Sequence, residues 1–409
     1  MTATGIDTDA QRTVATASYL DRVEELVPII RQHARRSEDD RRVATEVIDA
    51  AIEVGLFSAL VPVSFGGQGL GLRDLAEAAR ILAHGDASAA WALSFLIEHN
   101  WMACRFPMAA QQELFAERDY MLAAAPLVPG GRATPVDGGY RISGTWRYGT
   151  GFANAEWILV TCLEEVDGAD VPRAFLVPAS EVDVAQEWVA SGMAATSSHN
   201  LTGNDIFVPA HRSIPVEAFT STDAHGGIEH PEAIYYYPLH FGLNNMMAGI
   251  FVGIAEAVLE LYTQKLETSR PFGLSRMERT TSRVRWGAER ERVRAARLLY
   301  EDTLDRTIAK CEERAGYTQE DLGELQIATL VIAHMCHDAV TSLCKGVGSS
   351  SYQLSDPIQR YKRDIDVLIN HAGMDWDVVG DRSTRWALGL GAEATDWHSA
   401  PAHPTQVIS

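Results

Sequence analysis

The spacing of apolar residues predicts helices at the start of the chain. Over residues 19–36, apolar side chains recur every three or four positions, which places them on one face of a helix. Pro28 lies inside this run, so we expect a kink there or two shorter helices. A second apolar stripe covers 44–55. The pattern breaks over the glycine-rich segment 60–72, and helical spacing then resumes as one run over 75–100.

The middle of the chain has a different pattern and predicts strands. Within 121–228, runs rich in β-branched and aromatic residues are separated by clusters of Gly, Pro, Asp and Asn. This spacing favours an antiparallel sheet or a small barrel over βαβ units. Helical patterns return after residue 232. The expected helices there are 243–262, 276–314, 319–345 and 357–371.

The order of helices, strands and helices predicts an α+β fold that is mostly α. We expect an N-terminal helical domain, a middle antiparallel β domain, a C-terminal four-helix bundle and a short tail. Their predicted bounds are 1–120, 121–228, 229–395 and 396–409. The segment after Gly391 is expected at the surface or at a subunit contact.

Charge and composition narrow the range of partners and locations. The 409 residues include 35 Lys and Arg against 55 Asp and Glu, a formal net charge of −20. Nucleic acids and anionic membranes both bind clustered basic residues, so we expect neither as a partner. The five cysteines lack metal-ligand spacing, which indicates free thiols and no metal site. The first residues lack the order of a signal peptide, and no apolar stretch is long enough to cross a membrane. We therefore expect a cytoplasmic protein.

Several motifs are missing, and their absence argues against whole reaction classes. The sequence has no G-x-G-x-x-G after a strand, no P-loop, no H-E-x-x-H and no G-x-S-x-G. Nicotinamide binding in a domain of its own, ATP hydrolysis, zinc proteolysis and α/β-hydrolase chemistry are therefore disfavoured.

A series of short motifs, taken in order along the chain, resembles the acyl-CoA dehydrogenase superfamily. The segments are the glycine-rich loop GLFSALVPVSFGGQGLGL (55–72), DASAAW (86–91), SGTWRYGTG (143–151), SGMAATSS (191–198), RPFG (270–273) and PIQRYKRDIDVLINHAG (357–373). The resemblance covers nearly the whole chain. It implies a helical domain, a β domain and a four-helix bundle, assembled as a homotetramer around flavin.

Within that superfamily, the residues after Arg363-Asp364 favour oxygenation over dehydrogenation. Acyl-CoA dehydrogenases commonly place a glutamate base shortly after this pair, where the present chain has His371-Ala372-Gly373. Alanine cannot accept a proton, although Asp375 lies near and a base from another helix stays open. The flavin monooxygenases of the superfamily typically have a histidine followed by an aromatic-rich stretch, which resembles the segment that starts at His371.

The resemblance also implies a reaction. Oxygenase components of this kind take reduced FMN or FAD from a separate NAD(P)H-flavin reductase, and the missing nicotinamide motif agrees with that arrangement. Reduced flavin and O2 then give a C4a-hydroperoxide, which hydroxylates a small aromatic substrate such as a phenol, an indole or an aromatic polyketide. Three alternatives stay open: N-oxygenation of an amino sugar, acyl-CoA dehydrogenation, and a binding or structural role without turnover.

Three residues are catalytic candidates in this reading. His371 is expected to act as a base or to hydrogen-bond the peroxide, because a neutral imidazole suits either role near neutral pH. A histidine after a helix also fits simple binding to backbone carbonyls. His99 resembles a histidine that relatives hold near the substrate, and Thr150 resembles the hydroxyl residue at flavin N5. Both also fit ordinary helix or strand positions.

The remaining candidates are expected to bind the cofactor. Trp146 and Tyr148 would wall the flavin rings, although alternating aromatic residues also fit a packed pair of strands. Thr196 and Ser198 would line the flavin. Phosphate binding falls to residues in two loops, with a surface ion pair or a polar loop as the alternative. These residues are Arg270, Phe272, Ser349 and Ser350.

Overall fold

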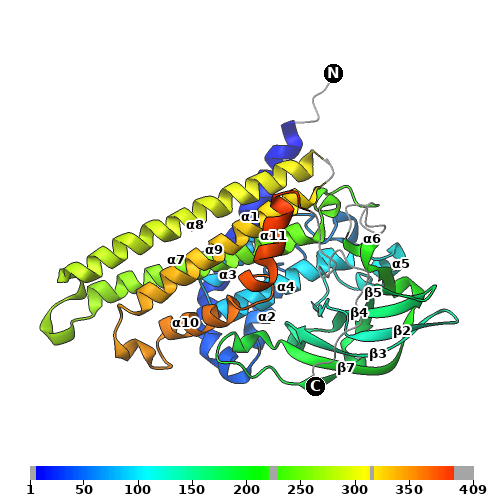
Figure 1. Ribbon diagram of the computed structural model, residues 1–409, viewed down its shortest axis with the longest axis horizontal. Helices are drawn as coiled ribbons and strands as arrows, with labels where there is room; N and C mark the ends of the chain where they lie inside the picture. The colour runs from blue at the N-terminus through cyan, green and yellow to red at the C-terminus, as the bar shows by residue number, and fades with distance from the viewer. Residues whose placement is uncertain (1–5, 221–228, 314–316, 391–409) are drawn as a thin grey trace.

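The chain forms helices at both ends and a sheet between them. The computed structural model describes residues 6–220, 229–313 and 317–390 (Figure 1). Helix α1 (Ile6–Asp40) runs continuously through Pro28, so the alternative of two shorter helices is wrong. Val23, Leu26 and Ile30 are buried on the turns around the proline. Burial of such side chains can exceed the roughly 3 kcal/mol that an interior proline costs a helix.

Four more helices complete the N-terminal region. They are α2 (Thr45–Glu53), α3 (Leu72–Ala83), α4 (Ala87–Ala103) and α5 (Met108–Leu114). The single run expected over 75–100 is wrong, because α3 and α4 are separate helices. Asp86 separates them: its side chain accepts a hydrogen bond from the backbone N–H of Ala89 at 3.0 Å and so caps α4.

Within the described residues, eight strands form one sheet. They are β1 (Ala123–Ala124), β2 (Gly131–Val136), β3 (Gly139–Gly149), β4 (Trp157–Val166), β5 (Ala169–Pro178), β6 (Asp183–Gln186), β7 (His199–Pro209) and β8 (Ser213–Pro215). Their order is β6-β7-β3-β2-β4-β5-β8, with β1 beside β4. Most neighbours are antiparallel, as expected. The sheet is nevertheless mixed, because β1 and β2 each run parallel to β4.

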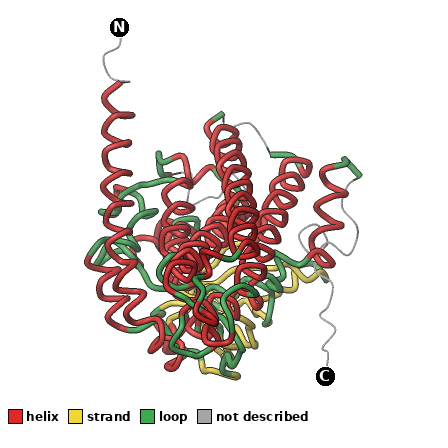
Figure 2. The backbone as a smooth tube through the Cα atoms, turned by 90° about the vertical axis from the view of Figure 1, so that its left-hand side faces the viewer, coloured by secondary structure: helices red, strands yellow, loops and turns green. Residues whose placement is uncertain are grey.

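The C-terminal region is helical again, as the sequence predicts. It contains α7 (Leu239–Thr268), α8 (Thr280–Glu312), α9 (Gln319–Cys344), α10 (Pro357–Leu368) and α11 (Asp381–Ala387), after the short α6 (Val216–Thr220). Helices α7, α8 and α9 lie side by side and extend away from the sheet (Figure 1). The strands gather on one side of the helices (Figure 2). The predicted tail lies outside the described residues.

Two of the long helices are apolar enough to span a membrane by length and composition. They are Gly242–Thr268 and Gln319–Cys344. Within the protein, 72% and 50% of their most apolar stretches are buried, and the core helices of soluble proteins pass the same test. Helix α7 packs against α3, α8 and α9, so the apolar surface of α7 belongs to the main core.

Two separate cores stabilise the molecule. The larger one joins the N-terminal helices to α7, α8, α9 and α10. The smaller one lies in the sheet, around Trp146, Ile158 and Phe175. The five cysteines are buried and unpaired, as the sequence predicts. Helix α4 contacts both α7 and α10 and also meets β1 and the turn Ala194–Thr196, so it connects the three regions of the chain.

Candidate functional site

Helix α4 carries a column of aromatic rings that joins the two candidate histidines. Trp91, Phe95 and His99 are spaced four residues apart, which places them along one face of the helix. The ring centroids of Trp91 and Phe95 are 4.9 Å apart, and those of Phe95 and His99 are 5.5 Å apart. His371 follows α10 and completes the column, with its ring 5.2 Å from that of Trp91. The fold thus places His99 and His371 at the two ends of one column of aromatic rings.

His99 is a neutral imidazole with an unprotonated nitrogen. The side chain is buried, and its Nδ1 lies 2.6 Å from the carbonyl oxygen of Ala123 in β1. A carbonyl can only accept, so Nδ1 carries the proton and Nε2 keeps its lone pair. Burial lowers the pKa of this imidazole to about 4, although the bond to Ala123 acts in the opposite direction.

His371 has the opposite tautomer. Its Nδ1 accepts a hydrogen bond from the backbone N–H of Gly373 at 3.2 Å, so in the neutral ring Nε2 carries the proton. The side chain is exposed, yet the surrounding protein lowers the pKa of the imidazole to about 4 by desolvation. One end of the column therefore presents an N–H donor and the other end an acceptor.

Thr150, Ser198 and Thr196 form a chain of hydroxyl groups. Thr150 follows β3, and the other two residues precede β7. The oxygens of Thr150 and Ser198 are 3.0 Å apart, and those of Ser198 and Thr196 are 2.8 Å apart. Thr196 donates in turn to the carbonyl oxygen of Met193 at 2.8 Å. The fold thus joins three predicted residues that lie on two separate segments.

The carbonyl at the end fixes the direction of every hydrogen bond in this hydroxyl chain. The only proton of the Thr196 hydroxyl goes to Met193, so Ser198 must donate to Thr196. Thr150 must then donate to Ser198. With its own proton used, the hydroxyl of Thr150 can only accept from a further partner. Thr150 is half-buried, so it is the end at which that partner can bind.

The two aromatic candidates on β3 lie in different environments. Trp146 is fully buried in the sheet core, and its indole N–H donates to the carbonyl of Thr161 at 3.0 Å. This environment fits the alternative of a packed pair of strands, so Trp146 lies in the sheet core and not at the candidate site. Tyr148 is exposed and has a left-handed backbone (φ 64°), and its ring lies 6.1 Å from that of Trp188. Trp188 donates to the same Met193 carbonyl, which links Tyr148 to the hydroxyl chain.

Helix α10 is held against α4 by a buried ion pair. The guanidinium of Arg360 donates to the carboxylate of Asp86 at 2.7 Å, and both side chains are buried. Asp364 lies one turn further along α10 and is also buried. Burial raises the pKa of the Asp364 carboxyl to about 8, and the nearby Asp86 carboxylate adds to the rise.

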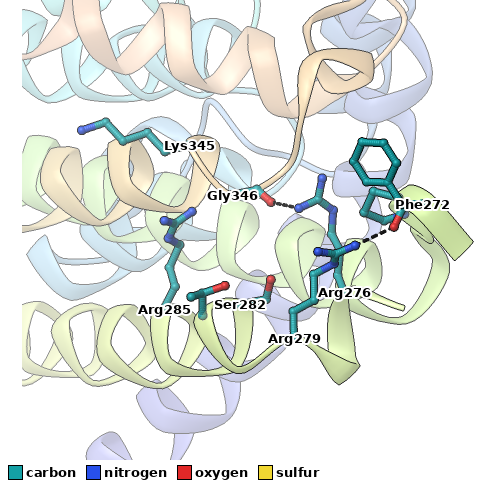
Figure 3. A pocket seen from close by; sticks show the side chains of 9 residues that line it. Phe272, Arg276, Arg279, Ser282, Arg285, Lys345 and Gly346 are labelled. Atoms are coloured by element: carbon teal, nitrogen blue, oxygen red, sulfur yellow. Dashed lines mark hydrogen bonds between the residues drawn. The ribbon is translucent and has the colours of Figure 1, made fainter. Parts of the chain in front are cut away.

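A cationic groove of about 310 Å³ lies where the loop after α7 meets the loop after α9. None of its lining residues is acidic, and four are basic: Arg276, Arg279, Arg285 and Lys345. The guanidinium groups of Arg276 and Arg285 lie on either side of Gly346 (Figure 3). Arg276 donates to the carbonyls of Gly346 and Val347, so it also ties the two loops together. Such a donor set suits a phosphate group.

The predicted phosphate-binding residues surround this groove, but only one of them lines it. Phe272 lines the groove and is fully exposed, with a left-handed backbone (φ 57°). Arg270 is exposed next to it, and its side chain makes no hydrogen bond or ion pair among the described residues. Ser349 and Ser350 are exposed and directly follow Gly348, where a Cβ atom would lie 2.7 Å from the guanidinium of Arg276.

Sequence reasoning missed the four basic residues of the groove. They lie in the loop before α8, near the start of α8 and directly after α9, outside the motifs from which the candidate site residues were chosen. A usable signal was present, because residues 270–285 contain five arginines and a single acidic residue, Glu278. The Met193 turn was also missed as the origin of the hydroxyl chain.

The chain matches two models of one family. A model described as the acyl-CoA dehydrogenase N-terminal domain matches residues 19–117, and one described as the C-terminal domain matches residues 245–376. Both matches agree with the resemblance that the sequence motifs indicate.

Similar proteins carry oxygenase names. A pigment production hydroxylase of Rhodococcus sp. is 30% identical over 92% of this chain and 98% of its own length. The oxygenase component of an FADH2-dependent resorcinol hydroxylase of Rhizobium sp. is 31% identical over 90% and 93%. The crystal structure of the HsaA monooxygenase of M. tuberculosis superposes with a TM-score of 0.86 at 25% identity, covering 92% of this chain and 98% of that one.

Proposed function

Because the chain belongs to the acyl-CoA dehydrogenase superfamily, and within it to the oxygenase components of two-component flavin monooxygenases, we propose that it hydroxylates a small aromatic substrate. A phenol, an indole or an aromatic polyketide fits this proposal. The observation that carries it is the aromatic column with an imidazole at each end. Flat aromatic side chains suit a flat substrate, and the two histidines supply one donor and one acceptor.

The described residues fit a reduced flavin. Thr150 ends the hydroxyl chain as an acceptor, which suits the N5–H that reduced flavin has and oxidised flavin lacks. The cationic groove suits a flavin phosphate, since it contains four basic residues and no acid. Reduced flavin, when bound, supplies the electrons that activate O2. Both FMN and FAD stay within the proposal.

Each histidine then has a separate role. His371 is the accessible end of the column, so its Nε2–H can donate to an oxygen atom at the reacting centre. The free Nε2 of His99 can accept from a phenol hydroxyl or an indole N–H, which raises the electron density of the ring. His99 is buried and its ring packs against that of the half-buried Phe95, so this role requires the substrate to reach an enclosed imidazole.

Two carboxyl groups near the column are candidates for the base that the dehydrogenase alternative requires. Asp375 accepts the backbone N–H of Asp377 at 2.8 Å and so caps its own turn. Glu98 is buried without a hydrogen-bond partner among the described residues, and burial raises its pKa well above the ordinary value. Burial disfavours the charged form of Glu98, and the carboxylate of Asp375 is engaged in its own turn, so neither group supports α-proton removal from an acyl-CoA.

The test is oxygen consumption by the protein with reduced FMN or reduced FAD. We expect a phenol or an indole to be hydroxylated, with one atom of ¹⁸O2 in the product by mass spectrometry. Labelled oxygen in an amino sugar would favour N-oxygenation. An unsaturated acyl-CoA without label would overturn the proposal in favour of dehydrogenation. No flavin-dependent product from any of the three would favour a binding role.

The proposed reaction requires a partner protein, and we also propose a location and an oligomeric state. An oxygenase component implies a separate reductase that supplies reduced flavin. We also propose a cytoplasmic homotetramer. The cationic groove lies at the connections of the long helices, which Figure 1 shows away from the sheet. In such an assembly, the groove of one copy and Thr150 of another copy would share one flavin.

A further inference from the structure

The turn from which the hydroxyl chain starts is held by α10. The backbone N–H of Met193 donates to the carboxyl oxygen Oδ1 of Asp364 at 2.5 Å, and both residues are buried. Arg363, next to it, donates to the carbonyl of Ser191 at 2.9 Å. A side chain on Gly192 would place its Cβ 2.1 Å from the carbonyl oxygen of Arg363, so the turn lies directly on the helix backbone.

This turn is strained, so it needs an external support. Met193 has a left-handed backbone (φ 54°), and so does Ser197 four residues later (φ 44°). A non-glycine residue in that region costs on the order of 1 kcal/mol or more and persists only where its surroundings hold it. The bond to Asp364 is the direct support at Met193, whose carbonyl oxygen is the acceptor that orders the hydroxyl chain.

We propose that Asp364 is a positioning residue for the reduced cofactor. By holding the N–H of Met193, Asp364 keeps the Met193 carbonyl aimed at Thr196, and that carbonyl makes Thr150 an acceptor at the far end of the hydroxyl chain. If the turn relaxes, Thr196 loses its fixed acceptor and the three hydroxyl groups can reverse. A reversed Thr150 points a proton at N5, which suits oxidised flavin and opposes reduced flavin. The inference rests on the proposed flavin function.

The test compares the affinities for reduced and oxidised FMN, each titrated anaerobically, and repeats the comparison with FAD. The wild-type protein is expected to prefer the reduced form. Asp364→Ala is expected to lower that preference about tenfold, the effect of one hydrogen bond of about 1.4 kcal/mol. Thr150→Val should lower it by a similar factor. The double variant should lose no more than either single variant, because both act on one contact.

Matched variants separate positioning from a loss of stability. Asp364→Asn keeps an oxygen that can accept from Met193, so it should retain the preference for reduced flavin. Gln111→Ala removes a buried polar group that bonds to the carbonyls of Cys104 and Phe106, so it should destabilise the protein without changing the preference. If Asp364→Ala fails to fold, Thr196→Val breaks the hydroxyl chain in the middle with little change in shape and should give the same loss.

The outcomes distinguish this inference from the proposed function. If the wild-type protein binds no reduced flavin, the proposed function fails. The positioning role fails if Thr150→Val loses the preference while a folded Asp364→Ala keeps it, or, where Asp364→Ala does not fold, while Thr196→Val keeps it. It also fails if Thr150→Val has no effect, since Thr150 would then not face N5.

Discussion

At the scale of single residues, two imidazoles with opposite tautomers define the candidate site. The tautomers follow from one backbone carbonyl and one backbone N–H, so no charged partner is needed to set them. Both rings have a lowered pKa and stay neutral at physiological pH. A neutral ring can donate at one nitrogen and accept at the other, which a protonated ring cannot do.

His371→Ala should separate oxygen consumption from product formation. We expect flavin binding to persist, hydroxylated product to fall by about 100-fold, and H2O2 to replace it, because the donor at the reacting centre is lost. Chromatography measures the amount of hydroxylated product, and a peroxidase assay measures the amount of H2O2. His337→Ala is the control, since His337 pairs with Asp366 at 3.0 Å and should behave as wild type. Normal coupling in His371→Ala would remove this residue from the mechanism.

His99 should make the fold sensitive to acid within a defined window. As pH falls below about 6.5, the unfolded chain binds a proton on this residue, while the buried ring stays neutral down to about pH 4. Stability is therefore unaffected above that window and is lost within it, by roughly 3 kcal/mol in total. In His99→Gln, the fall in the urea-derived free energy of unfolding from pH 7 to pH 4 should be smaller by this amount. An unchanged fall would show that the ring titrates normally.

Most of the candidate residues were chosen because they match positions in the motifs of the family. The packing around them could not be predicted from the sequence. Thr150, Thr196 and Ser198 meet because two distant segments of the sheet region lie together. From the sequence, Trp146 suited a flavin wall and a strand core equally well, and its burial and its bond to Thr161 distinguish the two. A hydrogen bond between distant segments has no local sequence signature, which is why the direction of the hydroxyl chain could not be predicted.

At the scale of elements, α10 connects the aromatic column to the hydroxyl chain. Arg360 pairs with Asp86 at the start of α4, Asp364 holds the Met193 turn, and His371 follows the end of the helix. A shift of α10 would therefore disturb both features together.

Arg360→Met should cost about 3–5 kcal/mol, because the carboxylate of Asp86 would stay buried without its partner. The free energy of unfolding in urea measures this cost. Arg306→Met is the matched control on α8, where an exposed arginine pairs with Glu324 and Asp302 and should cost less than about 1 kcal/mol. Equal costs for the two variants would mean that the Asp86 pair does not anchor α10.

The groove formed by the α7–α8 and α9–α10 connections should recognise phosphate rather than the flavin rings. Arg285→Gln is expected to lower the affinity for FMN and FAD about tenfold and to leave riboflavin binding unchanged, since riboflavin has no phosphate. Calorimetric titration with the three ligands measures the difference. Arg294→Gln is the control, because Arg294 is exposed on the same helix and pairs with Glu291. A loss for riboflavin as large as that for FMN would contradict a phosphate site.

Element types were predictable, and several element boundaries were not. The apolar stripes and β-rich runs predicted the order of helices, strands and helices. The break between α3 and α4 depends on a single capping aspartate, which the sequence also offers at many positions without a break. The parallel pairing of β2 with β4 depends on strand order, which period-two patterns do not encode.

At the scale of the whole molecule, exposed apolar side chains gather beside the cationic groove. Phe272, Leu274 and Met277 lie in the loop after α7, and Val284 follows on α8. Apolar side chains clustered in this way are typical of a surface that another copy covers.

Leu274→Asp should therefore weaken assembly and flavin affinity together. We expect a tetramer for the wild-type protein in light scattering, and smaller species with a weaker affinity for FMN in the variant. Val136→Asp, on an exposed strand position, is the control and should change neither quantity. Dissociation without any loss of flavin affinity would place the whole cofactor site within one copy.

The spacing of the rings on α4 restricts how this protein can change. Adding one residue to a helix rotates everything beyond it by about 100°. An insertion between Trp91 and His99 would therefore turn Phe95 or His99 away from its neighbour and break the column. Variants with new substrate preferences can replace side chains along α4 or lengthen the loops around it. They cannot alter the number of residues between those rings.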